Sequence, residues 1–208
     1  VADDEIRVPA GAYVARQFDI EPDASSASYP FAAAAVCGGW VRIPGLVAGS
    51  LQGDAEFASV LAAMGCDVVR DAHGTEVRRS GTLHGIDIDM ADISDLVPTM
   101  AVIAPYADSP VEVHGVGFIR AKESDRLGDL CAELRRAGVD AVELQDGLVV
   151  QPGAPHAARL GTHHDHRLAM AFAVLGLGLT GEESIEVENP GVVSKSWPHF
   201  WSSLEALT

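Results

Sequence analysis

Residues 23–45 read DASSASYPFAAAAVCGGWVRIPG: an acidic residue, a run of small apolar residues, and a glycine-marked turn into a strand-like segment. The same order returns in residues 95–115 (DLVPTMAVIAPYADSPVEVHG) and 165–190 (DHRLAMAFAVLGLGLTGEESIEVENP). Asp23, Asp95 and Asp165 start the three copies at intervals of 72 and 70 residues. Self-similarity at a fixed period indicates a repeated supersecondary unit, so we expect three units that each open with a helix and a strand.

A second segment with helical character follows each copy. These segments are SLQGDAEFASVLAAMG (50–65), KESDRLGDLCAELRRAG (122–138) and SKSWPHFWSSLEAL (194–207). The middle one places five small or apolar residues on a single helical stripe, namely Leu127, Leu130, Cys131, Leu134 and Ala137. Gly65 and Gly138 are expected to end the first two of these helices, because glycine readily adopts the left-handed conformation found there.

Two further strands are predicted at the end of the first two copies. They are residues 66–70 and 75–79, joined by the turn 71–74, and residues 139–144 and 148–151, joined by the turn 145–147. The unit is therefore helix, strand, helix, strand, strand, and the fold class is α/β. The third copy reaches Thr208 before any closing strands. Natural folds avoid open sheet edges, so we expect an absent N-terminal segment to supply the missing strands.

Residues 1–19 lie outside the repeat. The segment IRVPAGAYVARQFDI (6–20) alternates like a strand and leads into Glu21-Pro22, which we interpret as a linker. The chain also lacks an initiator methionine. Both features are typical of an excised fragment of a longer protein.

The bulk composition excludes several classes of protein. The formal charge is −16, which argues against binding to nucleic acid or to an anionic membrane. No apolar run approaches the ~20 residues that span a bilayer, and no leader peptide opens the chain, so we expect a cytoplasmic location. Cys37, Cys66 and Cys131 show no CxxC spacing and are expected to be buried free thiols.

Cations are scarce in this acidic chain, and four of them fall at related places in the repeat. Lys122 and Lys195, the only lysines, are 73 residues apart, and each is expected to open the second helix of its unit. Arg126 lies one helical turn beyond Lys122, and Arg167 lies in the first turn of the third unit's first helix. Cations are disfavoured at helix N-termini unless an anion binds there. We therefore predict a site for phosphate or carboxylate, with pairing to surface acids as the alternative.

Two acids are expected on the same face as these cations. Asp95 precedes an apolar helix, so its alternative interpretation is an N-cap, which is the role we expect for Asp23 and Asp165. Carboxylates beside cations stay ionised unless burial opposes this. Glu123 therefore needs a partly desolvated position if it is to deliver a proton.

Three histidines near the start of the third copy raise the question of a metal. His163, His164 and His166 are spaced i, i+1 and i+3, which does not converge three imidazoles from one helix. We expect a solvated helix start there and no metal site.

Several motifs resemble those of the 5-enolpyruvylshikimate-3-phosphate synthases. They are DASSASYPFAAAA, SLQGD, IRAKESDRL with ELRRAG, HDHRLAMAF and VSKSWPHF, in the family's order across roughly residues 20–207. The resemblance implies the C-terminal domain of a two-domain enzyme about twice this length, with repeated βαβαββ units that form an inside-out α/β barrel. It also implies that the third unit is incomplete here, because the family closes this domain with a strand from its N-terminus. By the same resemblance, residues 1–19 are the end of the other domain plus the crossover linker, and residues 20–208 form the C-terminal domain.

The resemblance implies a reaction as well. The family transfers the enolpyruvyl group of phosphoenolpyruvate to the 5-hydroxyl of shikimate 3-phosphate, by addition and elimination, without a metal or organic cofactor. This is a step of the shikimate pathway of aromatic amino acid biosynthesis and the target of glyphosate. By the same resemblance, Asp95 handles the 5-hydroxyl proton, Lys122 binds shikimate 3-phosphate and Glu123 protonates the methylene carbon. The cations that are similar to those holding phosphoenolpyruvate are Arg126, Arg167 and Lys195.

Two departures limit what is carried over. Phe118 stands where the family often has a polar residue that contacts the acceptor. The family's N-terminal lysine-serine motif and serine-rich phosphate site have no counterpart, so the fragment alone is expected to be inactive and to need the missing half as its partner. Two alternatives remain: a fragment of a UDP-N-acetylglucosamine enolpyruvyl transferase, and a non-catalytic anion-binding module.

Overall fold

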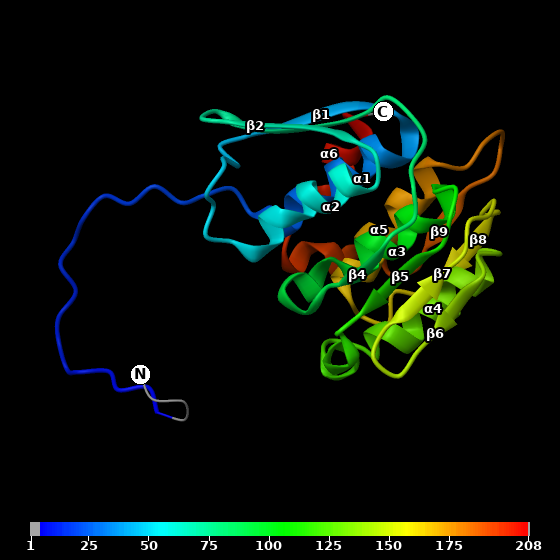
Figure 1. The fold of residues 1–208 in the computed structure, drawn as a ribbon. Helices are drawn as coiled ribbons and strands as arrows, with labels where there is room; N and C mark the ends of the chain where they lie inside the picture. The colour runs from blue at the N-terminus through cyan, green and yellow to red at the C-terminus, as the bar shows by residue number, and fades with distance from the viewer. Residues whose placement is uncertain (1–4, 208) are drawn as a thin grey trace.

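The computed structural model describes residues 5–207 as three consecutive units that share a central group of helices (Figure 1). The second unit has the fullest set of elements: β4 (Asp87–Asp89), α3 (Val97–Ile103), β5 (Val111–His114), α4 (Arg126–Arg136), β6 (Ala141–Glu143) and β7 (Leu148–Val150). Its strands form one sheet in the order β4-β5-β7-β6. β4 runs parallel to β5, and the other neighbours are antiparallel. The order of this unit is therefore βαβαββ.

The first and third units are shorter versions of the second. The first contains α1 (Ala24–Cys37), β1 (Gly39–Pro44), α2 (Phe57–Ala63), β2 (Asp67–Asp71) and β3 (Gly74–Arg79), with an antiparallel sheet in the order β1-β3-β2. The third contains β8 (Ala158–Leu160), α5 (His166–Leu177), β9 (Ile185–Val187) and α6 (Phe200–Glu205), and β8 and β9 pair in parallel. Within the described residues, the first unit lacks an opening strand and the third lacks the two closing strands, as predicted for the third.

The helices that open the three units form the middle of the core. α1, α3 and α5 pack against one another, and they are apolar around most of their circumference. Small side chains such as Ala32, Ala35 and Ala171 are fully buried between them, beside larger ones such as Met100 and Phe172. Small residues let the helix axes approach closely, which fills the interior without voids. The first turns of these helices consequently lie near one another.

The second helices lie further out and are amphipathic. In α4, the predicted stripe is confirmed, because Leu127, Leu130, Cys131 and Leu134 are all fully buried. Gly65 and Gly138 follow α2 and α4 with positive φ, as expected of residues that end helices. The strand predicted at residue 139 starts later, at Ala141, because the Val139 N–H still donates to the Leu134 carbonyl of the helix end.

Within residues 5–207, five short 3₁₀ helices connect these elements. They are η1 (Gly53–Glu56), η2 (Ala91–Leu96), η3 (Ala104–Tyr106), η4 (Gly117–Ala121) and η5 (Pro190–Lys195). Three of them, η1, η4 and η5, stand directly before the second helix of a unit. They therefore determine where residues such as Lys122 and Lys195 lie.

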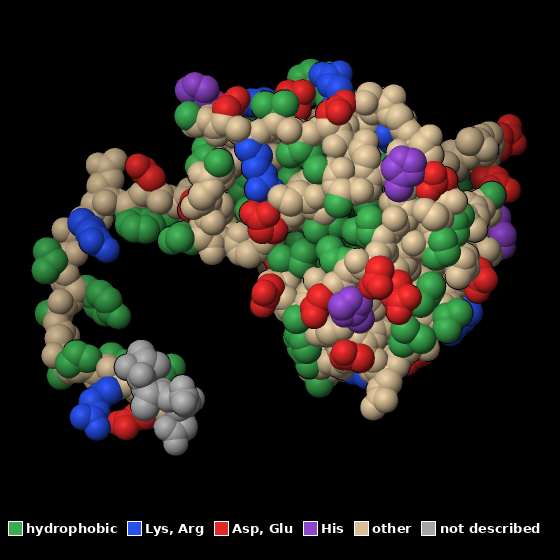
Figure 2. Space-filling model, in the orientation of Figure 1, with side chains coloured by type: hydrophobic (Ala, Val, Ile, Leu, Met, Phe, Trp, Pro, Cys, Tyr) green, Lys and Arg blue, Asp and Glu red, His purple; other side chains and the backbone are tan. Residues whose placement is uncertain are grey.

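The N-terminal segment differs from its prediction. Residues 6–23 form neither helix nor strand and extend away from the body of the protein (Figure 1). Figure 2 shows hydrophobic side chains standing free along this segment. Six large apolar side chains in it are at least 72% exposed: Ile6, Val8, Tyr13, Val14, Phe18 and Ile20. The predicted strand is wrong for this segment because it lies beside no sheet of the described residues with which it could form hydrogen bonds.

The three cysteines are free thiols, as predicted, although only two of them are buried. Cys66 and Cys131 lie in the core, whereas Cys37 is exposed at the end of α1. Among the described residues, no helix combines the length and the apolar character that crossing a membrane requires.

Candidate active site

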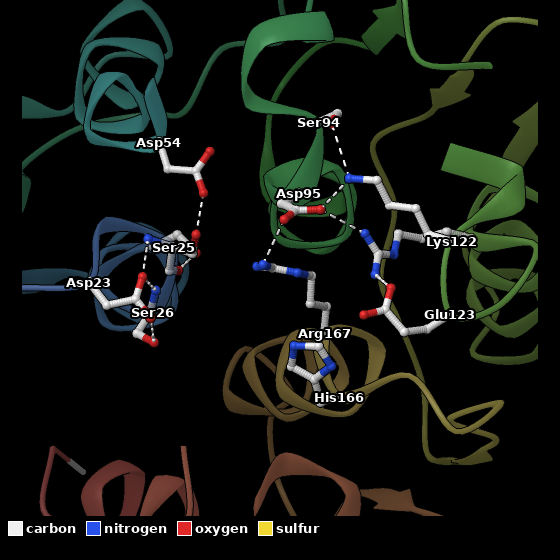
Figure 3. A network of polar contacts seen from close by, with 12 residues as sticks. Asp23, Ser25, Ser26, Asp54, Ser94, Asp95, Lys122, Glu123, His166 and Arg167 are labelled. Atoms are coloured by element: carbon white, nitrogen blue, oxygen red, sulfur yellow. Dashed lines mark hydrogen bonds and ion pairs between the residues drawn. The ribbon is translucent and has the colours of Figure 1, made fainter. Parts of the chain in front are cut away.

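The six predicted site residues come from different units and meet in one cluster. Figure 3 labels four of them, Asp95, Lys122, Glu123 and Arg167. Asp95 lies on η2, just before α3, and Arg167 lies in the first turn of α5. Lys122 and Glu123 lie between η4 and α4, and Arg126 is the first residue of α4. Lys195 ends η5 in the third unit. The predicted convergence of the four cations is therefore confirmed.

Asp95 is the centre of the cluster. Its Oδ1 atom accepts hydrogen bonds from Lys122 Nζ at 2.5 Å and from Arg126 Nη1 at 2.9 Å, and its Oδ2 atom accepts one from Arg167 Nη2 at 2.7 Å. Burial acts to raise the pKa of Asp95, but the Lys122 hydrogen bond and the three positive charges together lower it. The carboxylate is therefore ionised at neutral pH. The N-cap interpretation of Asp95 is wrong, since α3 begins without a side-chain cap.

Arg126 links three carboxylates from inside the protein. Its side chain is 0% exposed. Nε donates to Asp165 at 2.8 Å, Nη1 to Asp95 at 2.9 Å and Nη2 to Glu123 at 2.7 Å. A buried charge is tolerated only when it is paired and hydrogen-bonded, and this arrangement satisfies both conditions. Asp165 also caps α5, as predicted, by accepting the Arg167 N–H at 2.8 Å.

Glu123 is held as a carboxylate by two cations. Lys195 Nζ donates to its Oε1 atom at 2.5 Å, and Arg126 Nη2 donates to its Oε2 atom. The Lys195 hydrogen bond is the largest influence on this group, and it lowers the pKa of Glu123 to about 2 despite partial burial. In this arrangement Glu123 carries no proton at neutral pH. To act as an acid it needs Lys195 to be drawn elsewhere.

Arg167 and Lys195 are the cations with the most unused hydrogen-bonding capacity. Among the described residues, the Arg167 guanidinium makes one side-chain hydrogen bond, to Asp95, and Lys195 makes one, to Glu123. Lys195 is also 57% exposed, so an anion in solution can reach it. Lys122 is more enclosed, because it contacts Ser94 as well as Asp95 and lies over the ring of Phe118, at 5.8 Å from its centroid.

The two lysines do not open the second helices, which corrects the prediction. Lys122 follows η4 with a non-helical backbone, and α4 begins only at Arg126, where Asp125 caps the helix by accepting the Gly128 N–H. Lys195 likewise ends η5, and α6 begins at Phe200. Lys122 and Arg126 are therefore not on one helical face. Carboxylates, rather than helix ends, hold the lysines in place.

The alternative prediction was that the four cations pair with acids on the protein surface. The cations do pair with acids, but two of these acids are the predicted site residues Asp95 and Glu123, and the third is the buried Asp165. The pairing therefore lies within the cluster. It leaves four cations facing three carboxylates, so the cluster retains a net positive formal charge in a strongly acidic protein.

Sequence reasoning missed several residues beside the cluster. Asp54 accepts a hydrogen bond from Ser25 at the start of α1, and burial raises the pKa of Asp54 (Figure 3). His166 is 5% exposed, and burial lowers its pKa, which favours the neutral imidazole. Ser25 and Asp54 belong to the conspicuous DASSASY and SLQGD stretches, and that signal pointed to them without giving them a role.

The histidines near α5 do not converge. His163 contacts Glu133 at 2.9 Å and Asp129 at 3.5 Å, both on α4, while His166 turns into the protein beside Asp165. In the part of the chain that the structure describes, no three His, Cys, Asp or Glu side chains are grouped as ligands for a metal ion.

The sequence matches the family model described as EPSP synthase (3-phosphoshikimate 1-carboxyvinyltransferase) over residues 2–204. It is similar to a 3-phosphoshikimate 1-carboxyvinyltransferase of Nostoc punctiforme, with 47% identity over 97% of this chain and 47% of the relative. A protein of the same name from Methanoculleus marisnigri is 45% identical over 97% of this chain and 47% of that protein. The chain thus spans about half the length of the curated relatives it matches.

Solved structures share the fold. An EPSP synthase from Acinetobacter baumannii superposes with a TM-score of 0.77 and 24% identity, over 90% of this chain and 46% of that one. The enolpyruvyl transferase NikO from Streptomyces tendae gives a TM-score of 0.70 and 20% identity, over 90% and 43% of the two chains. The predicted α/β fold class is therefore confirmed.

Proposed function

The chain belongs to the EPSP synthase family, and we propose that it forms about half of an enzyme that transfers the enolpyruvyl group of phosphoenolpyruvate to the 5-hydroxyl of shikimate 3-phosphate. Phosphate is released in this reaction. The convergence of four cations on Asp95 and Glu123 is the observation that supports the proposal most directly. Such a cluster suits two small phosphorylated acids, because both substrates carry phosphate and carboxylate groups.

On the acceptor side, Asp95 takes the proton of the 5-hydroxyl. This role requires an ionised carboxylate, and the cations around Asp95 keep it ionised. Lys122, which donates to the same carboxylate, is close enough to contact the acceptor at the same time. Phe118 beside Lys122 offers an apolar ring at this point rather than a polar contact.

On the donor side, Arg167 and Lys195 bind the phosphate and carboxylate of phosphoenolpyruvate. Both cations have N–H groups available for further hydrogen bonds, whereas Arg126 is buried and holds three carboxylates. A guanidinium has five N–H groups, and Arg126 uses three of them in hydrogen bonds to carboxylates. The other two N–H groups are available to phosphoenolpyruvate once Glu123 turns toward the substrate. Arg126 is therefore both a donor contact and the residue that aligns Asp95 and Glu123.

The chemistry divides into two steps. In the addition, the 5-hydroxyl oxygen bonds to carbon 2 of phosphoenolpyruvate, its proton goes to Asp95, and Glu123 gives a proton to the methylene carbon. In the elimination, Glu123 takes a proton back from the new methyl group and the carbon–oxygen bond to phosphate breaks, which restores the double bond. The departing phosphate takes up the proton that Asp95 held. The positioned cations stabilise the charge on the departing phosphate.

Binding of the donor also prepares Glu123 as an acid. When the substrate anion takes Lys195, Glu123 loses the hydrogen bond that lowers its pKa most. Its pKa then rises, so that it can hold the proton which the methylene carbon receives. Substrate binding and proton delivery are thereby coupled through one lysine.

The other half of the active site belongs to the part of the enzyme that the relatives have in addition to this chain. Residues 1–19 are its end and the crossover, and residues 20–208 are the C-terminal domain. A cytoplasmic location agrees with the free thiols of Cys66 and Cys131.

Phosphate release tests this proposal. The full-length protein should turn over phosphoenolpyruvate with shikimate 3-phosphate, and the 208-residue chain alone should not, until the missing half is joined to it. Use of UDP-N-acetylglucosamine in place of shikimate 3-phosphate would overturn the acceptor assignment. Turnover by the isolated chain would contradict the division of the site between two halves.

A further inference from the structure

The hydroxyl group of Tyr29 is buried without a hydrogen-bond partner among the described residues. Tyr29 lies in α1, is 1% exposed, and packs edge-to-face on the Phe200 ring with a centroid distance of 5.9 Å. A phenylalanine would fill the same space without the cost of an unpaired buried hydroxyl. The sequence thus keeps a polar atom in a place where the resting structure gives it no bond.

The charged groups that act on this hydroxyl, Arg167, Asp165 and Arg126, all belong to the cation cluster. Ser25, four residues earlier and therefore on the same helical face, bonds to Asp54 beside the cluster (Figure 3). α1 also packs directly against α5, which carries Arg167. Among the cations, Arg167 has the largest effect on the pKa of the Tyr29 hydroxyl, although the two do not form a hydrogen bond of good geometry.

Of the two arginines in the cluster, Arg167 makes fewer side-chain hydrogen bonds. Arg126 is held by three carboxylates, but the Arg167 side chain has one hydrogen bond among the described residues, to Asp95. In the proposed reaction Asp95 must release this bond to receive a proton from the acceptor. The Arg167 guanidinium would then be held by the substrate anion alone.

We propose that Tyr29 is a positioning residue, whose hydroxyl oxygen accepts a hydrogen bond from Arg167 when this arginine exchanges Asp95 for an anionic substrate. The inference rests on the proposed function, because it takes Arg167 as a binder of phosphoenolpyruvate. Burial raises the pKa of Tyr29, so the hydroxyl stays neutral. A neutral oxygen can hold the guanidinium without competing with the substrate as a second anion.

Tyr29→Phe in the full-length protein tests this inference, because loss of stability and loss of function should separate. We expect the KM for phosphoenolpyruvate to rise roughly tenfold, which corresponds to about 1.4 kcal/mol. The unfolding temperature should stay unchanged or increase, since the variant removes an unpaired buried hydroxyl.

Tyr106→Phe is the matched control. The Tyr106 hydroxyl donates to the Leu175 carbonyl at 2.5 Å, near the opposite end of α5. Its removal should lower the unfolding temperature and leave the KM for phosphoenolpyruvate unchanged. Each variant thus removes one tyrosine hydroxyl beside α5, and the two variants have opposite expected effects on the unfolding temperature and on the KM.

Arg167→Ala separates the inference from the function beneath it. This variant should raise the KM for phosphoenolpyruvate, and Tyr29→Phe should have no further effect in its background, because the two residues act together. A normal KM in Tyr29→Phe, beside a raised KM in Arg167→Ala, would overturn the role of Tyr29 alone. A normal KM in Arg167→Ala would overturn the proposed function of this arginine and the inference with it.

Discussion

The Nζ atom of Lys195 lies 2.5 Å from the Oε1 atom of Glu123, although 72 residues separate them in the sequence. This hydrogen bond is the largest cause of the low pKa of Glu123, about 2. The ammonium is also well exposed to solvent. In the proposed reaction, this one contact therefore joins Lys195, which binds phosphoenolpyruvate, to Glu123, which protonates it.

Lys195→Ala should weaken the binding of phosphoenolpyruvate in the full-length protein. The loss of one charged hydrogen bond to the substrate costs about 1.5–3 kcal/mol, so the KM should rise by one to two orders of magnitude. The variant should also raise the pKa of Glu123, which shifts the pH profile of kcat/KM. Arg159→Ala, an exposed cation on β8 paired with Glu188 at 2.8 Å, is the control and should leave both quantities unchanged. Unaltered steady-state constants in Lys195→Ala would mean that Lys195 is an ordinary surface charge.

Arg126→Ala should affect folding as much as function. This substitution leaves Asp95, Glu123 and the buried Asp165 without their shared cation. Removal of one partner from a buried ion pair typically costs about 3–5 kcal/mol of stability. Urea denaturation of the full-length protein should show this loss. Arg136→Ala, whose side chain is mostly exposed and pairs with Glu133 at 3.5 Å, should change stability by less than about 0.5 kcal/mol.

The sequence repeat made the convergence of the cations predictable, but it did not predict which residues of the cluster are buried. Lys122 and Lys195 stand one repeat length apart, so equivalent places in similar units pointed to one face. The burial of Arg126 could not be predicted from the helical pattern of α4. Whether a residue at the start of this helix is buried depends on which residues of the other units cover it. Here Asp95 and Asp165, from other units, close over the guanidinium.

The short elements were the least predictable part of the fold. β4 and β8 have three residues each, which is too short for the alternation that marks a strand. Residues 6–20 do alternate, yet they form no strand in the described structure, because pairing partners rather than local pattern decide strand formation. The 3₁₀ helices before α4 and α6 likewise moved both lysines off the helix starts.

Glu123 should make the stability of the protein depend on acid pH. Its pKa is about 2 in the folded protein, below the ordinary value of 4.5. A carboxyl group with a lowered pKa stabilises the fold above the unfolded pKa and loses this contribution as the pH falls through the folded pKa. The wild type should therefore lose stability between about pH 4.5 and 2, and Glu123→Gln should flatten this part of the curve. Lys195→Ala should flatten it as well, and denaturation curves with the wild-type slope in both variants would contradict the pairing.

Asp95→Asn should separate proton transfer from substrate binding. The amide keeps the size of the carboxylate but cannot take the 5-hydroxyl proton, so kcat should fall by roughly 10²–10⁴-fold. Binding of phosphoenolpyruvate should not weaken, because Arg167 and Arg126 lose the carboxylate that competes with the substrate for their N–H groups. Single-turnover rates and equilibrium binding of phosphoenolpyruvate measure the two effects independently. If Asp95 served only to position Arg167, the same variant would weaken binding and leave the rate at saturating substrate near its wild-type value, which is the opposite result.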